Sequence, residues 1–192
     1  MANVFDKILK MSQVEVRKNS EASIDWFREK ASGQKVTSNQ LLTGSGYKDN
    51  VSNQIWPGSM FLFQYDAKHK ETLPYWDKFP LVFPFSYESD GFLGLNLHYL
   101  PYSMRASLMS NLMDRTSPNR HQDLKLSYQI LSAYSSLRYF KPCVKRYLYS
   151  HVKSQFLYIT PEEWPIAIFL PLQRFQKASD GKVYADSRKM LR

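Results

Sequence analysis

The residue types best suited to catalysis lie in one short segment that follows an apolar run. Asp66 and Lys68 stand two positions apart, and Glu71 and Asp77 follow them. In metal-dependent nucleases, carboxylates of this kind hold the metal ion while a lysine supports the charge that develops during cleavage. Such a site also needs an upstream acidic residue on a neighbouring strand, and the upstream Asp49 lies in a polar segment. A solvated loop explains the same residues, so a metal-dependent nuclease is only a distant third interpretation.

Histidine and cysteine, which often hold metals, show no spacing typical of a metal site. No two of the four histidines lie four residues apart, and the single Cys143 cannot form a disulfide within the chain. Lys141 and Lys145 near this cysteine favour a lowered thiol pKa, but no base residue accompanies it, which favours a structural role. We therefore predict no catalytic residue, no metal and no cofactor. The four histidines are His69, His98, His121 and His151.

Positive charge is concentrated in one third of the chain and offers a binding surface. The formal net charge is +9, and residues 102–160 carry nine lysines and arginines against two aspartates. A helix expected from Pro142 to about Tyr158 would place several of these cations in one row, together with a tyrosine able to stack on a base. The row predicts contacts to nucleic-acid phosphates or to an acidic protein partner, although a solvated helix face would look the same. Its residues are Arg138, Lys141, Lys145, Arg146, Tyr149 and Lys153.

The pattern of apolar and polar residues divides the chain into three parts. Residues 1–31 have apolar residues at helical spacing and are predicted to form an N-terminal helical segment with a long helix. Residues 32–58 are rich in Gly, Ser, Thr, Asn and Gln and are predicted to form a polar linker or arm. Residues 59–192 are predicted to form the core domain. Within it we expect a β-rich part at 59–101, a basic helical part at 102–160, and a C-terminal strand and helix at 161–192.

The β-rich part contains three expected strands joined by turn residues. Pro80 and Pro84 cannot donate hydrogen bonds to a neighbouring strand, which places their strand at an edge or at a bulge. Asp90-Gly91 predicts a tight turn into the last strand. The expected fold is therefore α+β, with a small bent antiparallel sheet or partly open β-barrel flanked by helices. The expected strands cover residues 60–65, 79–87 and 92–100.

Beyond the sheet the spacing of apolar residues becomes helical. Thr160 and Glu163 have the spacing of a capping box, although Pro165 limits the helix that follows to about one turn. Residues 166–170 are predicted to form a last buried strand, and a short helix is expected from Pro171. The longer helices are expected at about 102–116, 121–139 and 142–158.

Four residues of the β-rich part are candidate interface residues. Tyr75 and Trp76 belong to a rigid aromatic connection between strands, where they either cap the core or protrude as an interface anchor. Asn96 and His98 lie opposite the apolar face of the last expected strand, where they are predicted to meet solvent or a partner.

Three stretches of the sequence carry a resemblance to a known group of proteins. They are YDAKHKETLPYWDKFPL at 65–81, GLNLHYLP at 94–101 and FKPCVKRYL at 140–148. In these stretches, under half of the chain, the sequence resembles small, functionally unassigned proteins of contractile-tailed bacteriophages related to the T-even group. The resemblance implies a phage context and assigns no catalytic residue.

These observations favour a non-enzymatic bacteriophage virion or assembly component that acts through protein–protein contacts. The alternative is a DNA-binding accessory protein of phage replication, recombination or packaging that uses the basic row. Expected partners are other phage proteins or a second copy of the chain, with DNA as the partner of the alternative. No small-molecule substrate and no membrane partner are expected, because the longest apolar stretches are short and contain prolines. The expected location is the host cytoplasm during infection, or the virion.

Overall fold

A computed structural model describes residue 42 and residues 50–116 and 135–192 of the chain. The predicted helical segment at 1–31, most of the arm at 32–58 and most of the predicted helix at 121–139 lie outside these residues. The described part is α+β, as predicted, and is built on a mostly open antiparallel sheet. None of its helices combines the length and the apolarity needed to cross a bilayer.

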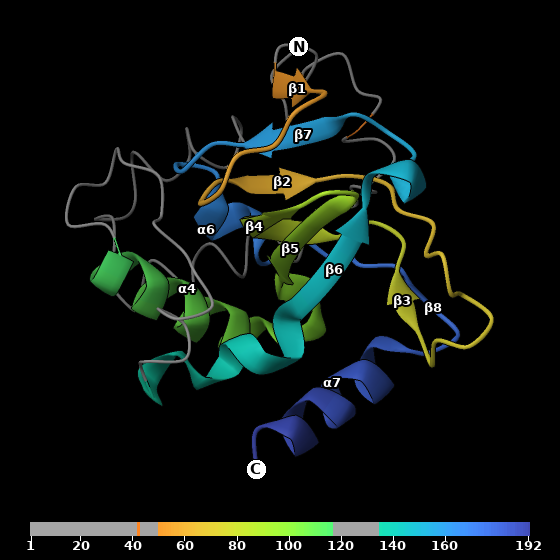
Figure 1. Ribbon diagram of the computed structural model, residues 1–192. Coiled ribbons are helices and arrows are strands. Elements are labelled where there is room, and N and C mark those ends of the chain that lie inside the picture. Colours follow the sequence, from red (N-terminus) through yellow and green to blue (C-terminus); the bar gives the residue numbers. More distant parts are fainter. Residues whose placement is uncertain (1–41, 43–49, 117–134) are drawn as a thin grey trace.

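The main sheet has six strands in the order β1-β7-β2-β4-β5-β6, and every neighbouring pair is antiparallel (Figure 1). A separate two-stranded sheet pairs β3 (Trp76–Asp77) with β8 (Phe175–Gln176). The strands of the main sheet are β1 (Val51–Ser52), β2 (Met60–Leu62), β4 (Leu81–Glu88), β5 (Gly91–Asn96), β6 (Val144–Leu148) and β7 (Phe156–Ile159).

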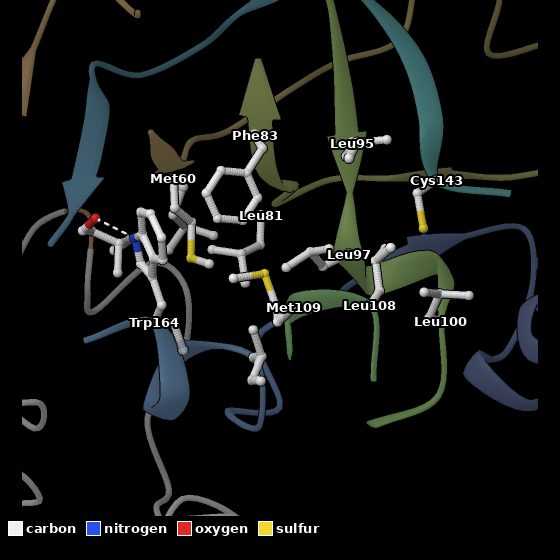
Figure 2. Packing of buried hydrophobic residues seen from close by; sticks show 14 of the residues in the cluster. Met60, Leu81, Phe83, Leu95, Leu97, Leu100, Leu108, Met109, Cys143 and Trp164 are labelled. Carbon is white, nitrogen blue, oxygen red and sulfur yellow. Dashed lines mark hydrogen bonds between the residues drawn. The ribbon is translucent and has the colours of Figure 1, made fainter. Parts of the chain in front are cut away.

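Alternating side chains give the sheet two apolar faces. On one face, leucines such as Leu81 and Leu95 join the larger core cluster, which the helices cover. Figure 2 shows this cluster, where Met109 and Leu108 of α4 (Tyr102–Thr116) and Trp164 of α6 (Trp164–Ala167) meet the strand residues. The indole Nε1–H of Trp164 donates to the carbonyl of Ile159 at 2.9 Å, which ties the start of α6 to β7.

The other face is lined by aromatic rings and is strongly curved. The ring centroids of Phe92 in β5 and Phe156 in β7 lie 6.2 Å apart, although β2 and β4 lie between these two strands in the sheet. In a flat sheet three strand spacings would separate them by about 14 Å. The sheet therefore bends until rings from distant strands meet. The buried residues of this second cluster are Ile55, Phe61, Phe63, Tyr65, Ala67, Val82, Phe92, Tyr147 and Phe156.

The helical elements lie on one side of the sheet and beyond its ends (Figure 1). Of the described elements, three 3-10 helices adjoin β5 and β6, two of them with three residues and one with nine. The α-helices are α4 (Tyr102–Thr116), α6 (Trp164–Ala167) and α7 (Asp180–Met190). The 3-10 helices include η2 (Leu97–Tyr99), η3 (Ser135–Cys143) and η4 (Tyr149–His151).

The three predicted strands of the β-rich part are present, two of them shortened. The first ends at Leu62, and the last ends at Asn96, whose side chain accepts a hydrogen bond from the His98 amide at 3.0 Å and starts η2. Pro84 lies in a central strand rather than at an edge, and a bulge between Pro84 and Ser86 accommodates the missing N–H. The bulge was therefore correctly predicted and the edge position was wrong.

The predicted helix at 142–158 is wrong. This stretch forms β6, then η4, then β7, and Pro142 lies within η3 instead of starting a helix. Val144 and Tyr147 favour strand, and pairing with β5 outweighs the helical spacing of the cations. The row of basic residues therefore does not lie along one helix.

The predicted strand at 166–170 is also wrong, although the residues are buried as expected. The carboxylate of Glu163 accepts from the Thr160 amide at 2.9 Å, as a capping box requires, and α6 follows. Pro165 fits because the first helical turn has no acceptor for its missing N–H. The helix expected from Pro171 begins only at Asp180, after Ser179 caps it.

Candidate nucleic-acid interface

The basic residues predicted to bind nucleic acid fall on three successive elements. Arg138 and Lys141 are exposed on η3, and their spacing of three residues places them on one face of a 3-10 helix. Lys145 and Arg146 are neighbours on β6 and so point to opposite faces of the sheet. The structure therefore does not bring all of these cations to one face.

Tyr149 and Lys153 complete the set at the far end of β6. Tyr149 begins η4 and is exposed, and Lys153 is exposed just after this turn. The backbone amide of Lys153 donates to the carbonyl of Gln64 at 2.8 Å, which fixes the position of its backbone. Both side chains therefore face solvent from an ordered backbone.

Lys145 is the least accessible cation of the set. Its ammonium lies 4.1 Å from the centroid of the Tyr99 ring, a cation–π contact. Burial lowers the pKa of this lysine, partly offset by the nearby Cys143. Lys145 therefore contributes to packing at the sheet edge as well as to surface charge.

Arg146 is exposed and carries an acidic partner. Its guanidinium donates at 2.7 Å to the carboxylate of Asp90, which lies in the turn between β4 and β5. An ion pair between exposed side chains contributes little stability, on the order of 0–1 kcal/mol. The arginine can therefore exchange this carboxylate for a phosphate at small cost.

Helix α7 adds cations that were not among the predicted site residues. It packs beside η2 and η3, and Figure 1 shows η3 in teal close to α7. Arg188 and Arg192 are exposed at its C-terminal end. Lys182 and Lys189 lie on another flank, where both pair with Asp186. The basic residues near the C-terminal end of the sequence were the signal that could have identified this additional charged surface.

Asn96 and His98, predicted at the surface, are instead fully buried with Asp77 in a polar cluster. The carboxylate of Asp77 accepts from His98 Nδ1 at 2.7 Å and from Asn96 Nδ2 at 3.3 Å. Its other oxygen accepts from the amides of Phe79 and Arg174 at 3.1 and 3.0 Å. Asn96 also donates to the Tyr147 hydroxyl at 3.0 Å. Turning of the chain at η2, which period-two reasoning missed, brings these groups inside.

Burial and hydrogen bonding act in opposite directions on this pair. Burial alone would raise the pKa of Asp77, but His98 and the two backbone amides that donate to it hold the pKa below its usual value. Burial lowers the pKa of His98, against the pull of Asp77. The pair is therefore a carboxylate and a neutral imidazole whose Nδ1–H donates. Within the described residues His98 Nε2 has no hydrogen-bond partner, which fits a lone pair better than an N–H.

Arg105 of α4 is a second buried polar centre, and sequence reasoning missed it. Its guanidinium is fully buried, yet every bond it makes is to a neutral acceptor. A single arginine on an amphipathic helix gives no sequence signal of this kind. It joins α4 to η2, to the segment after α6 and to α7. Its acceptors are Leu100 O, Ile168 O, His98 O, Gln173 Oε1 and the Tyr184 hydroxyl.

A family model described as Phage T4 terminal DNA protecting protein matches residues 1–192. The match covers the whole chain. The chain belongs to this family. No curated protein and no solved structure matches it. Family membership confirms the resemblance to proteins of the T-even phage group, and it extends that resemblance beyond the three stretches that carried it.

Tyr75 and Trp76, the other two candidate interface residues, are half-buried in this family member. Tyr75 packs against the rings of Tyr99 and Phe175 at 6.0 and 6.2 Å, and Trp76 packs against the aromatic cluster of the sheet. Both side chains therefore cap the core, and a role in an interface stays a prediction.

The segment that suggested a nuclease is arranged differently from a metal site. Asp66 pairs with Lys70 at 3.1 Å, whereas Asp77 is turned into the buried cluster. Across residues 50–116 and 135–192, no three histidine, cysteine or acidic residues gather as metal ligands. Cys143 is buried, and burial raises its thiol pKa to about 12, opposite to the lowering that nearby lysines favoured. Its surroundings support the structural role.

Proposed function

We propose that the chain binds the ends of duplex DNA during phage infection and protects them by occupying them. The observation that carries this proposal is the family match over the full length, because the family is described as protecting terminal DNA. Protection of this kind needs tight binding and no reaction, so we infer a non-enzymatic mechanism. The proposal adopts the DNA-binding alternative in place of the virion component that the sequence favoured.

The charge of the exposed surface supports this reading. Arg138 and Lys141 on η3 and Arg188 and Arg192 on α7 are exposed on two elements that pack together. Cations on one surface neutralise phosphates and release counterions from the duplex, which supplies most of the sequence-independent affinity. A protein that must protect ends of any sequence gains from binding the backbone rather than the bases. We therefore place the duplex against η3 and α7.

A salt titration of matched variants tests this placement. We expect Arg138→Gln/Lys141→Gln to lower affinity for a blunt duplex and to reduce the slope of log K against log salt by about 2. The control is Lys182→Gln/Lys189→Gln, which removes the same charge from the flank of α7 where both lysines pair with Asp186. An equal loss in the two variants would show that net charge alone acts, and would remove η3 from the interface.

A nuclease assay separates protection from binding. The protein is added to a linear duplex before a processive exonuclease, and the length of the remaining DNA is followed with time. We expect full-length DNA to survive at one bound protein per end. Digestion at the unprotected rate under saturating binding would contradict protection by occupancy.

A further inference from the structure

Two tyrosines stand out on the surface, at the end of the molecule formed by the β4–β5 turn. Tyr87 at the end of β4 is 55% exposed, and Tyr149 just after β6 is 41% exposed. They are the exposed aromatic side chains of the described residues, since the other rings there are buried or half-buried. We call these two residues the tyrosine rim.

Both tyrosines neighbour the same buried residue, Phe92. Phe92 is the cross-strand partner of Tyr87, and its ring centroid lies 5.8 Å from that of Tyr149 with a tilt of 38°. Phe92 in turn stacks on Tyr147 at 5.3 Å, inside the aromatic cluster. The rim is therefore the solvent-facing end of the aromatic face of the sheet, supported by a fully buried ring.

The rim is also held in place. The Tyr87 hydroxyl donates to the carbonyl of Ile55 at 2.8 Å, and the Tyr149 amide donates to the carbonyl of Asp90 at 3.0 Å. Side chains that are fixed before binding lose little conformational entropy when a ligand arrives. The Tyr87 side chain and the Tyr149 backbone are therefore fixed before binding, and two exposed aromatic rings suit a flat apolar ligand surface.

The charges near the rim point to a base rather than a phosphate as that ligand. Glu88 and Asp90 are both exposed beside it, and Arg146 neutralises only Asp90. The rim thus has no excess of positive charge to attract a phosphate. An uncharged aromatic face binds without that attraction, because stacking depends on contact area and ring polarisation.

Strand β6 connects the rim to the basic surface. It runs from η3, which carries Arg138 and Lys141, to Tyr149, with Lys145 and Arg146 between them (Figure 1). Its five residues span about 16 Å, which matches the length of about five base pairs along the axis of a duplex, at about 3.4 Å each. A duplex whose end meets the rim can therefore extend alongside β6 and reach the cations of η3 within about five base pairs of its end.

We propose that the tyrosine rim stacks on the terminal base pair of a duplex, so that an end is recognised by its exposed base-pair face. This inference rests on the proposed function and deepens it, since phosphate contacts alone do not distinguish an end from the middle of a duplex. Internal base pairs are covered on both faces by their neighbours, whereas the last pair has one open face. Tyr87 and Tyr149 then select ends, while Arg146 on β6 and the exposed cations on η3 and α7 supply affinity.

The test uses a blunt duplex that carries 2-aminopurine either in the last base pair or in the middle. Binding of the wild-type protein should quench the terminal probe and leave the internal probe unchanged. Tyr87→Ala/Tyr149→Ala should weaken binding to the blunt end about tenfold or more and abolish terminal quenching. Its affinity for a covalently closed circular duplex should match the wild type. Tyr149→Phe keeps the ring and should keep the quenching, which also controls for loss of fold.

Leu73→Ala is the matched surface control, because Leu73 is exposed on the loop between β2 and β3, away from the β4–β5 turn. It should behave as the wild type does in both assays. The rim is refuted if the double variant, or Tyr149→Ala alone, retains end affinity and terminal quenching while the wild type prefers ends. A wild-type protein that binds circles and ends equally would refute the proposed function itself, and the rim with it.

Discussion

At the scale of single residues, the interior of this protein depends on a few buried polar groups rather than on apolar packing alone. Asp77 accepts four hydrogen bonds from three stretches of the chain. The donors are the side chains of His98 and Asn96 and the amides of Phe79 and Arg174. It thereby fixes η2 and the β3–β8 sheet against the main sheet. Such groups specify one arrangement because any shift leaves a buried donor without an acceptor.

Replacement of this carboxylate should be among the most destabilising changes in the core. We expect Asp77→Ala to lower the free energy of unfolding by about 3–5 kcal/mol, since it strands the donors that face it. Urea denaturation followed by tryptophan fluorescence measures the change. Asp66→Ala is the comparison, because Asp66 only pairs with Lys70 at the half-exposed surface, and it should stay within about 1 kcal/mol of the wild type. Similar losses in both variants would contradict the central place of Asp77.

The lowered pKa of His98 predicts how stability depends on pH. Below its ordinary pKa of about 6.5, the unfolded chain binds a proton at this histidine that the folded protein excludes. Stability should therefore fall as the pH drops from about 7 toward the lowered folded pKa, by at most about 1.4 kcal/mol per pH unit from this group. The lowered pKa of Asp77 adds a further loss only below about pH 4. An unfolding midpoint in urea that rises as the pH is lowered from 6.5 to 5 would contradict a buried neutral imidazole at His98.

At the scale of elements, the proposed binding surface depends on how β6 is held against β5. Gly91 and Gly94 of β5 lie opposite Leu148 and Lys145 of β6. A methyl group at Gly91 would collide with the backbone carbonyl of Tyr147, and backbone cannot move aside as a flexible side chain can. The close approach of the two strands therefore requires glycine at position 91.

We expect Gly91→Ala to push β6 away from β5 and to lower stability by about 1–3 kcal/mol. Gly181→Ala is the control, because its new methyl group would have open space in the first turn of α7, with the nearest atom 4.0 Å away. That change should leave stability unaltered or raise it by up to about 1 kcal/mol. Thermal unfolding by circular dichroism compares the two variants. A Gly91 variant as stable as the Gly181 variant would show that the strands are not closely apposed in solution.

Local sequence signals predicted the elements that local interactions determine. The turn before Phe92, the bulge at Pro84 and the capping bond of Glu163 are set by residues within a few positions of each other, although the turn lies at Ser89-Asp90, one residue before the predicted Asp90-Gly91. The segment at 142–158 was predicted wrongly because its strands form only by pairing with β5 and β2, which are distant in the chain. Lys145 and Arg146 point to opposite faces of the sheet only because their segment forms a strand paired with β5, and local spacing does not reveal this pairing.

The polar core could not be predicted for the same reason. His98 has the spacing of a surface residue if the strand continues past Asn96. Only the hydrogen bond from the His98 amide to the Asn96 side chain turns the chain inward, toward Asp77 more than twenty residues away in the sequence. Arg105 likewise finds its acceptors on segments that lie far along the chain.

At the scale of the whole molecule, the polar groups that stabilise the fold and the cations proposed to bind DNA lie in different places. Asp77, His98 and Arg105 are enclosed in the interior, whereas the cations proposed to meet DNA lie outside on η3, β6 and α7. Changes to the exposed cations should therefore alter affinity with little effect on folding. This separation allows binding to be tested by substitution without loss of the scaffold.

The most direct test of the account compares DNA with ends and DNA without them. Equal masses of one plasmid, either linear with blunt ends or covalently closed and relaxed, compete for the labelled protein at moderate salt. We predict that the linear form binds preferentially, that two protein molecules saturate each linear molecule, and that cutting the circle once creates the tight sites. Equal binding per base pair to both forms, unchanged by cutting, would contradict the proposal that this protein recognises DNA ends.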